Sequence, residues 1–157
     1  MRGYRPALAL LLCGLSPWAQ AFCFEAAAAK YGVSPLLIRA IAVGESDLNA
    51  RAINHNRDRK TGKINSTDYG VMQVNSSHIP RLREMGVIRD KNDLLTRPCL
   101  NVQIGTWILA THFRVCGVNW NCLGSYNAGF RPDRHETRER YAGRIWRIYQ
   151  RLAEGKG

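Results

Sequence analysis

The fold of this chain is decided by the stretch Ser34-Pro35-Leu36-Leu37-Ile38-Arg39-Ala40-Ile41-Ala42-Val43-Gly44-Glu45-Ser46. Serine followed directly by proline favours a helix start, because serine caps the first turn and proline suits its backbone angle. The residues that follow are apolar on most faces of a helix, which predicts a largely buried helix. Glu45 is the one acidic residue of this stretch and falls at its C-terminal end.

The position of Glu45 predicts an unusual carboxyl group. Burial among apolar residues disfavours the charged form, and so does the negative end of the helix dipole. A carboxyl group that keeps its proton near neutral pH can donate it to a leaving oxygen. Glu45 is therefore the first candidate for a general acid.

Other helices are predicted on both sides of this stretch, and strand signals are almost absent. A long polar surface loop is expected from Arg51 to Asp68, with at most a small β-hairpin within residues 55–72. The last helix should bury the stripe Tyr141, Ile145, Ile148 and Leu152. The remaining expected helices are Phe24–Tyr31 stopped at Gly32, one from Ser76 or Ser77 through Met85, Pro98–Val115 ended by Gly117, one capped by Asn119 through Tyr126, and the last one, capped by Thr137. The predicted fold class is a mainly α single domain.

The N-terminus predicts a secretory signal peptide. Arg2 and Arg5 precede an apolar stretch, and Ala19-Gln20-Ala21 matches a small-x-small cleavage site. An uncleaved membrane anchor is the alternative, but the apolar stretch is short for a permanent span. We expect residues 1–21 to be the signal peptide and residues 22–157 to form one domain, with no stable membrane span after cleavage.

The cysteines fit an exported protein. The chain has five, and Cys13 falls within the predicted signal. The other four predict two disulfides. Cys116 and Cys122 are close in sequence around Gly117, which favours a local bridge and leaves Cys23 to pair with Cys99. A zinc site is the rival interpretation, but no Cys-x-x-Cys pair and no matching histidine spacing occur, so no metal and no cofactor are expected.

The net charge of +11 requires an anionic partner or a solvated basic face. Arg140, Arg144, Arg147 and Arg151 follow one stripe of the last predicted helix. No nucleic-acid partner is expected, because the neighbouring aromatic residues are predicted to form a buried stripe and export removes the chain from the cytoplasm. Attraction to an anionic wall polymer or membrane surface explains the charge more simply, and a solvated arginine face is the plainest alternative.

Two uncharged motifs follow Glu45-Ser46, namely Gly70-Val71-Met72-Gln73 and Ser125-Tyr126-Asn127-Ala128-Gly129, and an isolated Tyr141 follows in the last helix. In this order they resemble the soluble lytic transglycosylase family, over roughly residues 23–149. The resemblance implies a lysozyme-like fold and cleavage of peptidoglycan between N-acetylmuramic acid and N-acetylglucosamine. It is strongest to small exported members that accompany type III and type IV secretion and conjugation systems. It thereby implies the periplasm as location, glycan strands as substrate and components of such an apparatus as partners.

The resemblance assigns roles to individual residues. Glu45 becomes the catalytic acid and base, which would yield a 1,6-anhydro product without consuming water. Substrate-binding roles are implied for Ser46, Gln73, Tyr126, Asn127 and Tyr141. The residue types suit this chemistry, because a neutral amide both donates to and accepts from sugar groups, and a tyrosine offers a ring face and a hydroxyl.

Three alternatives remain open from the sequence. A hydrolysing lysozyme would use a second carboxylate. Asp47 points away from Glu45 on a continuing helix, and Asp68 is expected to form a turn. The second alternative is a non-catalytic wall-binding module that keeps the fold, and the third is a nucleic-acid-binding protein of a transfer system.

Overall fold

A computed structural model of the chain describes residues 22–156, and it confirms the predicted mainly α class. The predicted signal peptide, residues 1–21, lies outside the described residues. The α-helices are α2 (Phe24–Tyr31), α3 (Pro35–Ser46), α4 (Ile79–Glu84), α5 (Asp93–Thr96), α6 (Pro98–Cys116), α7 (Trp120–Ala128) and α8 (His135–Ala153), with 3₁₀ turns η1 (Ser76–His78) and η2 (Pro132–Arg134). Between residues 22 and 156, no helix combines the length and hydropathy needed to cross a membrane.

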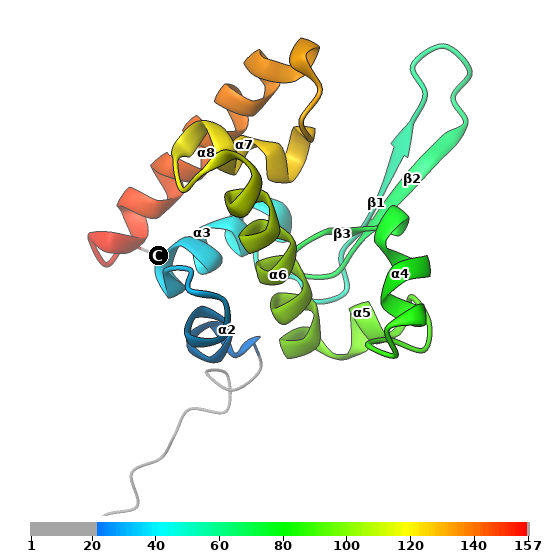
Figure 1. Ribbon diagram of the computed structural model, residues 1–157, viewed down its shortest axis with the longest axis horizontal. Coiled ribbons are helices and arrows are strands. Elements are labelled where there is room, and N and C mark those ends of the chain that lie inside the picture. The colour runs from blue at the N-terminus through cyan, green and yellow to red at the C-terminus, as the bar shows by residue number, and fades with distance from the viewer. Residues whose placement is uncertain (1–21, 157) are drawn as a thin grey trace, which may run out of the picture.

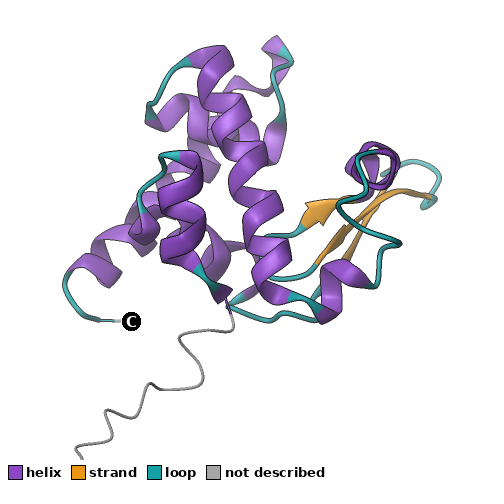
Figure 2. Ribbon diagram, turned by 60° about the horizontal axis from the view of Figure 1, so that its bottom comes forward, coloured by secondary structure: helices purple, strands orange, loops and turns teal. Residues whose placement is uncertain are grey.

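The helices form one body with a small sheet at its side (Figures 1 and 2). Helix α3 packs against α2 and α8, and α7 packs against α6 and α8. The sheet consists of β1 (Ile53–Arg57), β2 (Ile64–Tyr69) and β3 (Val74–Asn75), antiparallel in this order. The β1–β2 hairpin extends away from the helical body (Figure 1). The end of α3 and the chain that leaves β2 therefore meet where body and sheet join.

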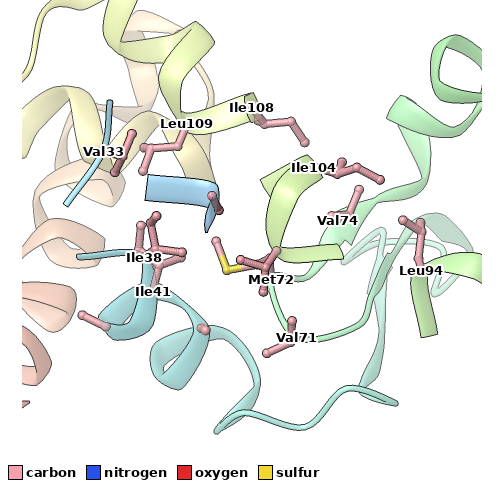
Figure 3. Packing of buried hydrophobic residues seen from close by; sticks show 14 of the residues in the cluster. Val33, Ile38, Ile41, Val71, Met72, Val74, Leu94, Ile104, Ile108 and Leu109 are labelled. Atoms are coloured by element: carbon pink, nitrogen blue, oxygen red, sulfur yellow. The ribbon is translucent and has the colours of Figure 1, made fainter. Parts of the chain in front are cut away.

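The hydrophobic core explains why α3 decides the fold. Ile38 and Ile41 of α3 are fully buried, and so is Met72, which follows β2. Figure 3 shows Met72 lying between these two isoleucines and Ile104 of α6. Because protein interiors are densely packed, this contact fixes the segment after β2 against the helices.

Several sequence predictions are confirmed in detail. Helix α2 stops at Gly32, and α3 starts after Ser34, whose side chain accepts a hydrogen bond from Leu37 N. The Asn119 side chain caps α7 by accepting from Cys122 N at 2.8 Å. In α8, Tyr141, Ile145 and Ile148 are buried as predicted, and Leu152 is partly buried.

The segment from Arg51 to Asp68 is not the long irregular loop that was expected, whereas the small hairpin allowed within residues 55–72 is present and begins slightly earlier, at Ile53. This segment contains β1 and most of β2, and a third strand joins them beyond the predicted hairpin. All five residues of β1 are exposed, so the strand has no alternation of buried and exposed positions that a sequence pattern could reveal. Its pairing with β2 is held in part by side chains, such as the Asn56 amide that donates to Ser66 Oγ at 3.0 Å.

Two predicted helix starts are also wrong. The Asn75 side chain, rather than Ser76 or Ser77, caps the turn η1, and α4 runs only from Ile79 to Glu84. Helix α8 begins at His135 instead of after Thr137, because the preceding turn η2 already leads the backbone into the helix. The short helix α5 carries no apolar period and was not predicted.

The two disulfides join the cysteine pairs that the spacing predicts. Cys23 is bonded to Cys99, which ties the segment before α2 to the start of α6. Cys116 is bonded to Cys122, which ties the end of α6 to α7. Both bridges lie away from the end of α3 and stabilise the helical body that carries it.

Candidate active site

Glu45 lies in the last turn of α3 and is partly buried. The hydroxyl of Tyr141, from α8, donates a hydrogen bond to Glu45 Oε1 at 2.5 Å. Tyr141 itself is only 4% exposed. Glu45 and Tyr141, which are far apart in sequence, are therefore in direct contact.

Burial raises the pKa of Glu45 above the ordinary glutamate value of 4.5. The hydrogen bond from Tyr141 and the positive charge of Arg144 oppose this effect, and the Asp68 carboxylate adds to it. Burial outweighs the two opposing groups, so the protonated form is favoured over a wider pH range than in water. Glu45 is thus suited to donate a proton and, afterwards, to be stabilised as a carboxylate.

Arg144 is a residue of this site that the sequence analysis placed only in a basic stripe. Its guanidinium donates a hydrogen bond to the carbonyl of Gly44, next to Glu45, and lies 5.1 Å from the centre of the Tyr141 ring. The spacing of three residues from Tyr141 on a helix was the one available signal. Arg144 therefore links α8 to the end of α3 and holds a positive charge beside the acid.

Gly44 allows α3 and α8 to approach closely. A Cβ atom at this position would lie 2.5 Å from Ile145 Cδ1 and 3.2 Å from Ile148 Cδ1, so a side chain here would require these two isoleucine side chains of α8 to shift. The missing side chain at Gly44 therefore lets the isoleucines of α8 pack directly on the turn of α3 that carries Glu45.

The segment Gly70–Gln73 is fastened to the helices by hydrogen bonds. Ser46 Oγ donates to the carbonyl of Val71 at 2.8 Å, so it does not serve as a partner of the Glu45 carboxylate. From α6, the buried Asn101 accepts from Met72 N at 2.8 Å and donates to the carbonyls of Tyr69 and Leu94. Asn101 was not singled out from the sequence, because its role depends on contacts across the fold.

Tyr126 of α7 reaches the same segment. Its hydroxyl donates to the carbonyl of Met72 at 2.8 Å. Burial, followed by the nearby Glu45 and Asp68 carboxylates, raises the pKa of Tyr126 well above its usual value. Burial and Glu45 likewise raise the pKa of Tyr141. Both phenols thus remain protonated donors under ordinary conditions.

The side chain of Gln73 is fixed in the interior by hydrogen bonds of its amide group. Its Nε2 donates to the carbonyl of Gly70 at 2.8 Å, and its Oε1 accepts from Asn54 Nδ2 at 2.6 Å. The backbone of Gln73 has a φ of 49°, in the left-handed region that few non-glycine residues adopt. Such conformations cluster at functional sites, where surrounding contacts hold them in place.

Asn127 is exposed at the end of α7. Together with Tyr141 it lines a surface depression. Asn127 is therefore placed where a bound molecule would reach it beside the Tyr141–Glu45 pair.

The two other carboxylates considered from the sequence differ in position. Asp47 is exposed and caps the C-terminus of α3, as expected of a helix-end residue. Asp68 lies in β2 rather than in a turn, so that prediction is wrong. Its carboxylate accepts hydrogen bonds from Asn56 and Asn75, at 2.7 and 2.6 Å, from the two neighbouring strands.

No set of three or more His, Cys, Asp or Glu side chains within residues 22–156 is arranged to hold a metal ion. The described site instead offers one carboxyl group with a raised pKa, two phenol donors and several amide groups. This set can protonate a leaving oxygen by general acid catalysis.

Comparison with known proteins agrees with this geometry. The model of the transglycosylase SLT domain matches residues 22–149. A peptidoglycan-binding-like protein of Escherichia coli O157:H7 is 48% identical over 147 residues, which cover 94% of this chain and 87% of that protein.

Two further relatives are similar over most of their length. The invasion protein IagB of Salmonella typhi is 40% identical over 137 residues, covering 87% of this chain and 79% of IagB. The protein IpgF of Shigella flexneri is 37% identical over 144 residues, covering 92% of this chain and 90% of IpgF. By its match to the domain model and to these relatives, the chain belongs to the transglycosylase SLT domain family.

Proposed function

We propose that this protein is a peptidoglycan lytic transglycosylase. It cleaves the β-1,4 bond between N-acetylmuramic acid and N-acetylglucosamine and leaves a 1,6-anhydro end on the muramic acid. The observation that carries this proposal is Glu45, whose pKa is raised by burial and whose carboxyl group accepts the hydrogen bond from Tyr141.

In this reaction Glu45 acts twice. Its protonated form donates to the glycosidic oxygen, and the C1–O bond breaks as positive charge develops at C1. The resulting carboxylate takes the proton of the C6 hydroxyl, whose oxygen closes onto C1. Tyr141 and Arg144 stabilise the carboxylate between the two steps, since both lower the pKa of Glu45. One carboxyl group suffices because its proton is restored at the end.

The remaining site residues position the sugar. Asn127 is exposed beside Tyr141 and is free to bind a hydroxyl or N-acetyl group. Tyr126 would contact the sugar with its ring, because its hydroxyl is already hydrogen-bonded to the carbonyl of Met72. We assign Ser46 and Gln73 to the same substrate site, where they also hold the segment after β2 in place.

The cellular role we propose is local opening of the cell wall for a secretion or conjugation apparatus. The protein would reach the periplasm by means of a signal peptide in residues 1–21, and residues 22–157 would form the catalytic domain. Its similarity to an invasion protein supports this role. The two disulfides are consistent with an oxidising compartment.

Hydrolysis, as in lysozyme, is a second candidate, and Asp68 favours it. The Asp68 carboxylate contributes to the raised pKa of Glu45, so it lies within electrostatic reach of the acid. A second carboxylate is what a hydrolysing glycosidase uses to activate water or to form a covalent intermediate.

The products of digestion distinguish these activities. Purified peptidoglycan is digested with the protein, and the released fragments are examined by mass spectrometry. We expect 1,6-anhydro muramic acid ends. Reducing ends formed by addition of water would identify a lysozyme, and binding without release of fragments would identify a wall-binding module.

Substitution of Tyr141 by phenylalanine should change the pH dependence of this activity. The Tyr141 hydroxyl favours the carboxylate form, so its loss should raise the pKa of Glu45 further. The high-pH limb of kcat/KM, where the general acid loses its proton, should move to higher pH, with the maximal rate reduced about tenfold. Tyr149→Phe on the same helix is the control. A limb that stays in place or moves to lower pH would contradict the assignment.

A further inference from the structure

A depression of about 660 Å³ runs along α8 beside the catalytic residues. Asn127 and Thr137 line it, and so does Tyr141, whose hydroxyl contacts Glu45. We call it the arginine depression, because Arg140, Arg144 and Arg147 line it as well. A molecule bound there would contact Tyr141, which is hydrogen-bonded to the proton donor Glu45.

The lining is strongly basic. Besides the three arginines it contains a single acidic residue, Glu139. Arg140 forms an ion pair with Glu136, with 2.7 Å between Nη1 and Oε1. Arg144 donates a hydrogen bond to the carbonyl of Gly44. Arg147 is exposed and has no ion-pair partner within residues 22–156. The depression therefore holds positive charge that the described part of the protein does not neutralise.

Gly143 is a second feature of the depression that packing does not explain. It lies in the interior of α8, where glycine is less favourable than alanine. A Cβ atom at Gly143 would meet nothing closer than Arg147 Nη1, at 3.7 Å. This contrasts with Gly44, where a Cβ atom would lie 2.5 Å from Ile145 Cδ1 of the same helix α8. A larger side chain at Gly143 would instead extend into the arginine depression.

We propose that the arginine depression binds the carboxylates of the stem peptide that peptidoglycan carries on muramic acid. This inference rests on the proposed function, since it concerns the same substrate. Cleavage at muramic acid brings the peptide attached to that sugar close to Glu45, and guanidinium groups are well suited to bind carboxylates. The protein should therefore prefer glycan strands whose stem peptides are negatively charged.

The test compares two forms of one substrate. Uncross-linked, peptide-bearing glycan strands are used directly, or after their peptide carboxylates have been converted to primary amides. For the wild-type protein, kcat/KM should be roughly tenfold higher on the charged strands, with about threefold from each of two arginines, as for exposed ion pairs. Arg140→Gln together with Arg147→Gln should bring this ratio close to one.

Two further variants separate binding in the depression from general charge effects. Arg151→Gln, on the same helix but outside the lining, removes one positive charge and should leave the ratio unchanged. Gly143→Leu keeps every charge but fills part of the depression, and it should lower kcat/KM on peptide-bearing strands mainly by raising KM.

The outcomes keep this inference and the proposed function apart. Equal cleavage of charged and amidated strands by the wild type, or a ratio that the double arginine variant does not alter, would overturn the inference alone. Failure to cleave either strand would overturn the proposed function, and the inference with it.

Discussion

Replacing Glu45 with glutamine is expected to lower the rate of glycan cleavage by roughly 10⁴-fold, the upper end of what a general acid–base residue contributes. Glutamine keeps the size of the side chain and still accepts the hydrogen bond from Tyr141, but its amide is not acidic and cannot transfer a proton to the leaving oxygen. The rate is measured as release of soluble fragments from peptidoglycan. Glu84→Gln, at an exposed position in α4, is the control and should cleave at the wild-type rate.

The same substitution should stabilise the protein at neutral pH. In the unfolded chain the pKa of Glu45 is near the ordinary glutamate value of 4.5, whereas it is raised in the folded protein. The wild-type protein therefore loses stability as the pH rises from the pKa of Glu45 in the unfolded chain through its higher pKa in the folded protein. Glu45→Gln removes this loss, so its midpoint in urea should exceed that of the wild type at pH 7 and approach it at pH 4. A variant that is inactive because it is less stable would contradict the catalytic assignment.

Replacing Asn101 with leucine is expected to cost about 3–5 kcal/mol of stability, because it leaves up to three buried backbone groups without a partner. Asn101 accepts from Met72 N and donates to the carbonyls of Tyr69 and Leu94, all in the interior. The effect is measured by urea unfolding, with the exposed Asn92→Leu as control.

The activity of Asn101→Leu should fall even where the protein remains folded. Met72 carries the carbonyl that receives the Tyr126 hydroxyl, so movement of this segment displaces Tyr126 from Glu45. We expect a decrease in kcat of more than tenfold under conditions where circular dichroism shows native helix content. Full activity in a folded, destabilised variant would show that the segment after β2 has no part in positioning the site.

The sequence predicted the parts of the fold that depend on local signals. Helix α3 has a serine cap, a proline in its first turn and an almost continuous apolar surface, so both its start and its burial were predicted correctly. The β1–β2 hairpin was allowed within residues 55–72 but its extent was underestimated, because its strands are polar and largely exposed and cross-strand hydrogen bonds hold it together. These cross-strand side-chain pairs can be recognised only once the register of the two strands is known.

The site was predicted in the same uneven way. Glu45 and Tyr141 were identified from the motif order, and the structure brings them into contact. Arg144 and Asn101 were not identified, because each acts on a backbone group from another element, at Gly44 and at Met72. Asp68 was placed in a turn, and only its position in β2 shows that its charge bears on Glu45.

The central claim is that Glu45 keeps its proton because burial outweighs the pull of Tyr141 and Arg144. The most direct measurement is a pH titration of the side-chain carboxyl carbon of Glu45 by NMR, with the signal assigned by its absence in Glu45→Gln. The account predicts a midpoint clearly above 4.5, the ordinary value for glutamate. A midpoint at or below that value would mean that the carboxyl group is ionised where the proposed reaction needs an acid, and would contradict the account.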